Sequence, residues 1–185
     1  MSIPVDPNFI ELVAADLGVA PAFIEKDWHA MRLVALVLKI SDPNFTPVFS
    51  GGTSLSKGFN LIQRFSEDLD FKMLLPKEAL NTRNQRRNYR NRLVQLIRRE
   101  AGWLLKESNI MSRNNSHFFS LSVAYESVYQ AHDSLRPDLK LEMSFVSPNW
   151  SAEQRSLQSF IALFSRRRTR NPCYSLCFSC RNRSR

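Results

Sequence analysis

Apolar side chains recur at helical spacing near the start of the chain. From Pro21 to Ile40, apolar residues follow one another at intervals of three and four, which is typical of one face of an α-helix. Pro21 suits the first turn of that helix, and the second half of the segment is apolar nearly all round, which indicates a helix buried in the domain. A shorter helix is predicted over Pro7–Leu17.

A glycine pair separates the next two elements. The pattern predicts a turn over Ser41–Pro47 and a short strand over Val48–Ser50, and a helical pattern resumes over Leu55–Arg64. Gly51 and Gly52 lie between the strand and the helix, so the segment is predicted to run from strand through a tight turn into helix.

Three later segments have strand or helix periodicity. Polar and apolar residues alternate over Asp68–Met73, which is typical of a half-buried strand. Glu78–Lys106 has the spacing of one long or two shorter helices. Further strands are predicted over His117–Val128 and Leu139–Val146, the second with clear alternation.

Composition limits the class of protein. A length of 185 residues with 43% hydrophobic and 23% charged residues fits one domain with a sizeable core. No segment approaches the roughly 18 to 20 apolar residues that a membrane-spanning helix needs. The N-terminus shows no export signal, so a cytoplasmic location without a membrane partner is expected.

The net charge of +9 is unevenly distributed. Eight arginines and no acidic residue follow from Arg155 onward, so the first 154 residues are nearly neutral, with 18 basic and 17 acidic side chains. Within them, Arg83–Arg113 has nine basic and two acidic residues. The Arg83–Arg99 face could guide RNA through phosphate contacts, or it could be an ordinary solvated helix face.

The cysteines and histidines offer little metal-binding chemistry. The three cysteines lie close to the C-terminus, at positions 173, 177 and 180, without a nearby histidine to complete a zinc site. His29, His117 and His132 have no metal-ligand spacing, and they are interpreted as surface or core residues.

Acidic side chains on two predicted strands suggest a metal site. Asp68 and Asp70 are two residues apart on a strand and therefore point to the same face. Glu142 occupies a similar position on the Leu139–Val146 strand. If the strands are neighbours, the three acids converge on one or two Mg²⁺ ions and could support phosphoryl transfer. The alternatives are a solvated strand face and a surface charge pair between Lys140 and Glu142.

The glycine turn could supply the phosphate-binding half of such a site. Gly51 and Gly52 allow close approach of a phosphate, and the following helix begins with free N–H groups. Thr53 or Ser54 could add a hydroxyl contact, and Lys57, one turn into the helix, could reach a triphosphate. An ordinary turn is the alternative interpretation.

Four motifs follow one another along the chain: FIEKDW (Phe23–Trp28), FSGGTSLSK (Phe49–Lys57), RFSEDLDF (Arg64–Phe71) and RPDLKLE (Arg136–Glu142). In this order they resemble the nucleotidyltransferase toxins of the AbiEii/AbiGii type, which occur in type IV toxin–antitoxin and phage-defence pairs. The likeness covers roughly residues 8 to 150.

The resemblance implies a fold, a reaction and roles for individual residues. It implies an α+β, nucleotidyltransferase-like mixed sheet flanked by helices, and Mg²⁺-dependent transfer of a nucleoside monophosphate from a nucleoside triphosphate. The acceptor would be an RNA, such as a tRNA end, and the partner would be a cognate antitoxin. In these roles, the triphosphate would be held by Gly51, Gly52, Thr53 and Ser54 with help from Lys57, and the metal by Asp68, Asp70 and Glu142.

The C-terminal segment departs from the family pattern. Relatives continue into a further helical region, whereas this sequence turns to an acid-free segment rich in Arg, Ser and Cys. We therefore predict a nucleotidyltransferase-like domain over residues 1–164 and a basic, disordered or frame-shifted tail over residues 165–185, with truncation near Phe164 that could inactivate the enzyme. The alternative is a catalytically silent RNA-binding or antitoxin-partner module of the same fold.

Overall fold

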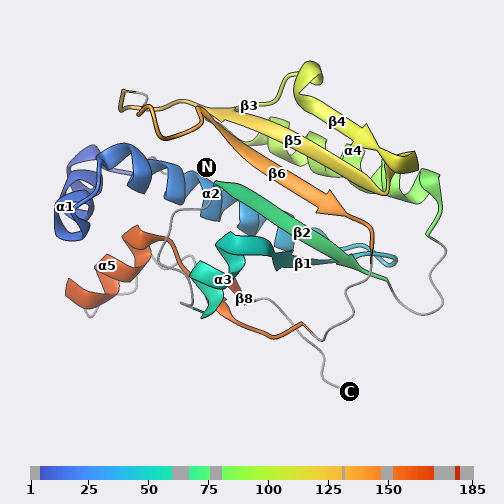
Figure 1. The fold of residues 1–185 in the computed structure, drawn as a ribbon, viewed down its shortest axis with the longest axis horizontal. Coiled ribbons are helices and arrows are strands. Elements are labelled where there is room, and N and C mark those ends of the chain that lie inside the picture. The colour runs from blue at the N-terminus through green and yellow to red at the C-terminus, as the bar shows by residue number, and fades with distance from the viewer. Residues whose placement is uncertain are drawn as a thin grey trace.

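The fold is built around a mixed sheet with helices on both sides (Figure 1). The computed structural model describes residues 5–59, 67–75, 81–130, 132–146, 152–168 and 178–179. The helices are α1 (Pro7–Leu17), α2 (Pro21–Leu38), α3 (Gly51–Phe59), α4 (Arg83–Arg99) and α5 (Phe160–Arg168). The strands are β1 (Thr46–Ser50), β2 (Asp68–Leu74), β3 (Trp103–Leu104), β4 (Ile110–Arg113), β5 (Phe118–Tyr125), β6 (Asp138–Ser144), β7 (Ser156–Leu157) and β8 (Phe178–Ser179).

The main sheet has six strands among the described residues, in the order β1-β2-β6-β5-β3, with β4 also paired to β5. β2 and β6 are parallel, and the other pairs are antiparallel. A short 3₁₀ turn, η2 (Asn114–Ser116), joins β4 to β5. The predicted α+β fold with a mixed sheet flanked by helices is confirmed.

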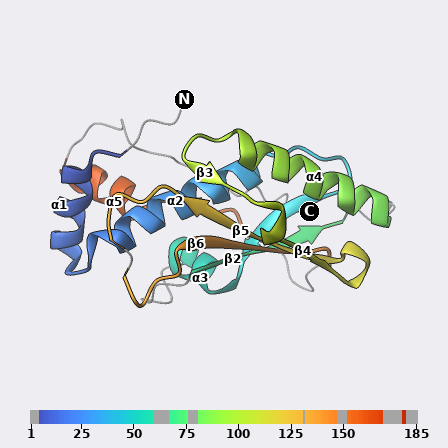
Figure 2. The same ribbon diagram turned by 90° about the horizontal axis from the view of Figure 1, so that it is seen from above.

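One face of the sheet is covered by α2 and α4. The apolar residues of β2 and β6 alternate with polar ones, and those that face the helices, such as Phe71 and Leu141, are fully buried. They pack with Tyr89 of α4 and Val34 of α2 in the main core. Figure 2 shows α4 on one side of the sheet and α3 on the other.

The structure corrects the predicted long helix over Glu78–Lys106. The helix begins at Arg83, where Thr82 and Gln85 form a reciprocal cap, and it ends at Arg99. Gly102 then adopts a positive φ of 79°, and Trp103–Leu104 forms β3 instead of helix. Residues 76–80 lie outside the described residues.

Other element boundaries also differ from the prediction. α3 begins at Gly51 instead of Leu55, and the rest of its predicted length lies outside the described residues. The strands β4 and β7 and the helix α5 were not predicted.

The predicted domain boundary falls inside α5, where Ser165 is buried and donates to the Ile161 carbonyl at 2.9 Å. Residues 169–177 and 180–185 lie outside the described residues, so the nature of the tail stays a prediction.

Within the described part of the chain, we find no single helix with the length and apolar composition of a membrane span. α1 and α2 satisfy these two criteria only together, as a pair bent by 111°.

Replacing Leu141 by alanine is expected to lower the free energy of unfolding by about 2–5 kcal/mol, because this side chain is fully buried between the sheet and its helices. Urea unfolding followed by circular dichroism measures the change. The same replacement at Leu104, which is 56% exposed, is the control and should cost less than about 0.5 kcal/mol. Equal losses at the two positions would contradict the described core.

Candidate active site

The three acids predicted to bind metal lie on neighbouring strands of the sheet. Asp70 of β2 is directly opposite Glu142 of β6, and Asp68 is opposite Lys140. Residues directly opposite one another point to the same side of a sheet, so all four share the face turned away from the core. All four are half-buried. The topology therefore brings the acids together, whereas their role in metal binding stays a prediction.

Two cations neutralise part of this acidic face. Lys140 Nζ lies 2.5 Å from Glu142 Oε1 and 3.9 Å from Asp68 Oδ1. Arg136 Nη1 donates to Asp68 Oδ1 at 2.8 Å. Asp70 makes no ion pair within the described part of the chain. The charged residues beside it on this face of β2 and β6 are Asp68, Lys72, Glu142 and Lys140, which is paired with Glu142.

The charges on this face shift two pKa values. Burial raises the pKa of Asp70, and the negative charges of Glu142 and Asp68 raise it further, against the opposing effect of Lys140. The hydrogen bond to Glu142 raises the pKa of Lys140. Ionisation of Asp70 is therefore disfavoured in the folded protein.

The donor set suits a hard divalent ion, because it consists of carboxylate oxygens on adjacent strands. In the arrangement described, however, no group of three His, Cys, Asp or Glu side chains among the described residues is placed to hold a metal ion. Arg136 and Lys140 hold Asp68 and Glu142 instead. The fit to Mg²⁺ therefore rests on donor chemistry and strand register, and Mg²⁺ binding stays a prediction.

Gly51 is required by both its conformation and its surroundings. It follows β1 directly and has a positive φ of 73°, a backbone conformation that residues other than glycine rarely adopt. A Cβ at this position would overlap the carboxylate of Asp70. The N-terminal end of α3 can therefore lie against the acidic face only with glycine at position 51, and Gly52 continues the same turn of helix.

The hydroxyl groups of the predicted phosphate-binding motif bond to the protein main chain. Thr53 Oγ1 donates to the Asp68 carbonyl at 2.8 Å, and Ser54 Oγ donates to the Gly51 carbonyl at 2.9 Å. Both side chains are buried. Thr53 thus fixes α3 against the first residue of β2, while the first N–H groups of the helix are the kind of donors that bind phosphate.

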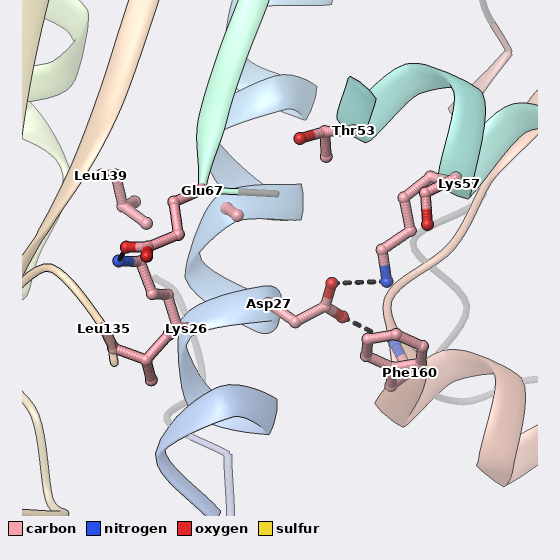
Figure 3. Close-up of a pocket in the computed structure, with 10 residues that line it drawn as sticks. Lys26, Asp27, Thr53, Lys57, Glu67, Leu135, Leu139 and Phe160 are labelled. Carbon is pink, nitrogen blue, oxygen red and sulfur yellow. Dashed lines mark hydrogen bonds and ion pairs between the residues drawn. The ribbon is translucent and has the colours of Figure 1, made fainter. Parts of the chain in front are cut away.

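Lys57 points into a small cavity between α2, α3 and α5 (Figure 3). Its Nζ lies 2.5 Å from Asp27 Oδ1 and 3.4 Å from the centre of the Phe160 ring. The Phe160 backbone N–H donates to the other oxygen of Asp27 at 2.8 Å. Lys57 and Asp27 are both buried, so the ammonium charge is matched by Asp27. The predicted contact of Lys57 with a triphosphate stays a prediction.

An ion pair between buried Lys26 and half-buried Glu67 fixes the starts of the two parallel strands. Lys26 Nζ lies 2.5 Å from Glu67 Oε2 and 2.7 Å from the Arg136 carbonyl. The Arg136 N–H also donates to Glu67 Oε2 at 2.7 Å. Burial raises the pKa of Glu67. The hydrogen bonds that Glu67 accepts from Lys26 and from the Arg136 N–H, together with the positive charges of these two residues, outweigh burial, so the pKa of Glu67 is lowered.

A run of charged residues in α2 is the sequence signal for these pairs. Glu25, Lys26 and Asp27 are three consecutive charged residues in a helix that is otherwise largely apolar, and all three are buried. Glu25 accepts hydrogen bonds from Ser127 Oγ and the Val128 N–H. Because buried charges need partners, such a triplet predicts three separate contacts to other parts of the fold.

A mixed sheet flanked by helices, with acids on adjacent strands beside a helix that begins at a glycine pair, is the nucleotidyltransferase-like arrangement predicted from the motifs. The family model described as "Nucleotidyl transferase AbiEii toxin, Type IV TA system" matches residues 32–177. The chain belongs to this family, which confirms the resemblance seen in its sequence.

Among solved structures, one match is MenT4, a nucleotidyltransferase toxin from Mycobacterium tuberculosis. The two sequences are 21% identical, and the match covers 80% of this chain with a TM-score of 0.44. The match covers 48% of MenT4, so the chain spans about half the length of that structure. Among curated proteins, none matches the sequence.

Replacing Asp70 by asparagine is expected to stabilise the folded protein at pH 7. The pKa of Asp70 is raised above its ordinary value of 3.8, so the ionised carboxylate destabilises the fold. This cost is absent below pH 3.8 and grows as pH rises through the folded-state pKa. The urea midpoint of the variant should exceed that of the wild type at pH 7 and approach it near pH 3.

The control for this prediction is Glu107→Gln, which also exchanges a carboxylate for an amide, at an exposed position where Glu107 pairs with Arg98. It should show no stabilisation that grows with pH. A destabilised Asp70→Asn protein at pH 7 would contradict the predicted electrostatic cost.

Lys26 and Glu67 are expected to be strongly coupled. Lys26→Met should lower the free energy of unfolding by about 3 kcal/mol, because it leaves Glu67 without its buried cation. A double-mutant cycle with Glu67→Gln measures the coupling, which should exceed about 1 kcal/mol. The exposed pair Arg98–Glu107, tested with Arg98→Met and Glu107→Gln, should give less than about 1 kcal/mol. Similar values for the two pairs would argue against a specific role for Lys26.

Proposed function

We propose that the protein is a Mg²⁺-dependent nucleotidyltransferase toxin that transfers a nucleoside monophosphate from a nucleoside triphosphate to an RNA acceptor. The observation that carries this proposal is the register of β2 and β6, which puts Asp70 opposite Glu142 and next to Asp68. Membership of the AbiEii family supports the same reaction class. A cognate antitoxin and a cytoplasmic location belong to this proposal.

In the proposed reaction, an acceptor hydroxyl oxygen forms a bond to the α-phosphorus while the bond to pyrophosphate, the leaving group, breaks, and the hydroxyl proton is released to solvent. Asp68, Asp70 and Glu142 would hold Mg²⁺, which when bound neutralises phosphate charge and orients the reacting oxygens. The Gly51–Ser54 segment would bind phosphate oxygens with its backbone N–H groups. Lys140 lies beside Glu142, where its charge can offset that of a triphosphate.

Asp70→Asn is expected to reduce nucleotide transfer by on the order of 100-fold or more, because it removes a carboxylate from the proposed metal site. Full-length protein, Mg²⁺ and each labelled nucleoside triphosphate are incubated with total RNA, and labelled RNA is measured. Glu107→Gln is the matched control and should keep wild-type transfer. Chelation of Mg²⁺ should abolish labelling by the wild type.

Equal labelling by the wild type and Asp70→Asn would overturn the enzymatic proposal. An equal loss of labelling in Glu107→Gln would show that the effect of Asp70→Asn is not specific to the acidic face, and this would also contradict the proposal. If the folded wild type labels no RNA with any of the four nucleotides, the proposal also fails, and the alternative of a silent RNA-binding or antitoxin-partner module is favoured.

A further inference from the structure

A cationic groove lies between α4 and the turn that joins β4 to β5. Its volume is about 370 Å³. The side chains that line it are all arginine, asparagine or serine, with no acidic and no apolar residue among them. They are Arg83, Arg87, Arg90, Ser112, Arg113, Asn114, Asn115 and Ser116.

The arginines of this groove lack counter-ions within the described part of the chain. Arg83, Arg87 and Arg113 make no ion pair there, and Arg90 bonds only to the Asn91 side chain, at 3.2 Å or more. Two other arginines of α4 are paired: Arg98 Nη2 lies 2.7 Å from Glu107, and Arg92 pairs with Asp42. Four gathered positive charges without an acid repel one another, and a bound anion would relieve that repulsion.

The floor of the groove is held in place by a buried arginine. Arg86 is 4% exposed; it donates to the Asn81 side chain at 2.8 Å and to the Asn115 carbonyl at 2.9 Å. Asn114, Asn115 and Ser116 are consecutive residues with positive φ, at 49°, 52° and 67°. Non-glycine residues rarely adopt this conformation, so contacts such as the hydrogen bond from Arg86 keep the turn in it. This indicates that the surface of the groove has a fixed shape.

The groove lies at the β4 edge of the sheet: α4, which supplies three of its arginines, covers the core side, and Arg113 of β4 lies on the side that carries the acids. Glu142 is opposite Ser120 of β5, Ser120 is opposite Met111 of β4, and Arg113 is two residues further along β4. Arg113 therefore points to the same face as Glu142. With strands about 4.8 Å apart and about 3.3 Å per residue, the two positions are on the order of 10–15 Å apart. Figure 1 shows β4 at the outer edge of the sheet, with α4 behind it.

We propose that this groove binds the phosphate backbone of RNA and guides the strand over the β4 edge toward the acidic face. Arginine, serine and asparagine side chains are typical phosphate contacts. A protein partner or a membrane surface would call for apolar side chains, which the groove lacks. The inference takes its RNA acceptor from the proposed function, but binding can be measured without any transfer.

The experiment measures binding of a labelled single-stranded RNA to the full chain at several salt concentrations, without Mg²⁺ or nucleotide. Arg83→Gln/Arg87→Gln should weaken binding about tenfold or more at low salt. It should also make the slope of log K against log salt shallower by about 1.4, which is about 0.7 for each lost phosphate contact. Arg98→Gln/Arg99→Gln removes the same charge from the other end of α4 and should change both quantities little.

A second variant, Arg90→Gln/Arg113→Gln, removes one arginine from α4 and one from β4. Its loss of affinity and its change in salt slope should match those of Arg83→Gln/Arg87→Gln, with thermal melting used to check that each variant folds. Unchanged binding in both groove variants, or an equal loss in the Arg98/Arg99 control, would overturn the inference. Tighter binding of the wild type to anionic vesicles or to a polyglutamate peptide than to RNA would also overturn it. RNA binding that depends on the groove, in a protein that transfers no nucleotide, would support this inference while the proposed function fails.

Discussion

The parallel pairing of β2 with β6 is the constraint on which the candidate site depends. Parallel strands cannot be joined by a short hairpin turn, so the register of this pair has to be fixed by contacts from elsewhere. Lys26 provides such contacts, because its ammonium binds both Glu67, just before β2, and the Arg136 carbonyl, just before β6. A shift of one residue in this register would place Glu142 on the core side of the sheet.

The acidic face carries an electrostatic cost that the rest of the domain offsets. Asp68, Asp70 and Glu142 are brought together on a half-buried face, where like charges disfavour ionisation. Lys140 and Arg136 relieve part of the repulsion, and the apolar residues on the other face of the same strands supply the packing. Such a concentration of poorly compensated charge is typical of sites selected for function more than for stability.

Two groups of positive charges in the described part of the chain have different surroundings. Lys26 and Lys57 are buried, and each is matched by one carboxylate, so they serve to connect α2 with β2 and α3. The arginines around η2 lie close together, and none of them pairs with an acid in the described part of the chain. Net charge alone does not separate these groups, because a paired cation contributes to the total as much as an unpaired one does.

Local sequence patterns determined much of the framework. The alternation in β2 and β6, the buried α2, the glycine at position 51 and the shared side of Asp68 and Asp70 all follow from periods of two or 3.6 residues and from the conformational freedom of glycine. These properties depend on near neighbours in the chain, so the sequence alone predicted them.

Only the tertiary structure decided which distant segments meet. It paired Lys57 with Asp27, formed β3 where helical spacing had predicted helix, and placed Glu142 opposite Asp70. Spacing along the chain reports which face of an element is buried, but it carries no information on the partner that buries it. Strand order, register and the matching of buried charges are settled by packing between elements far apart in sequence.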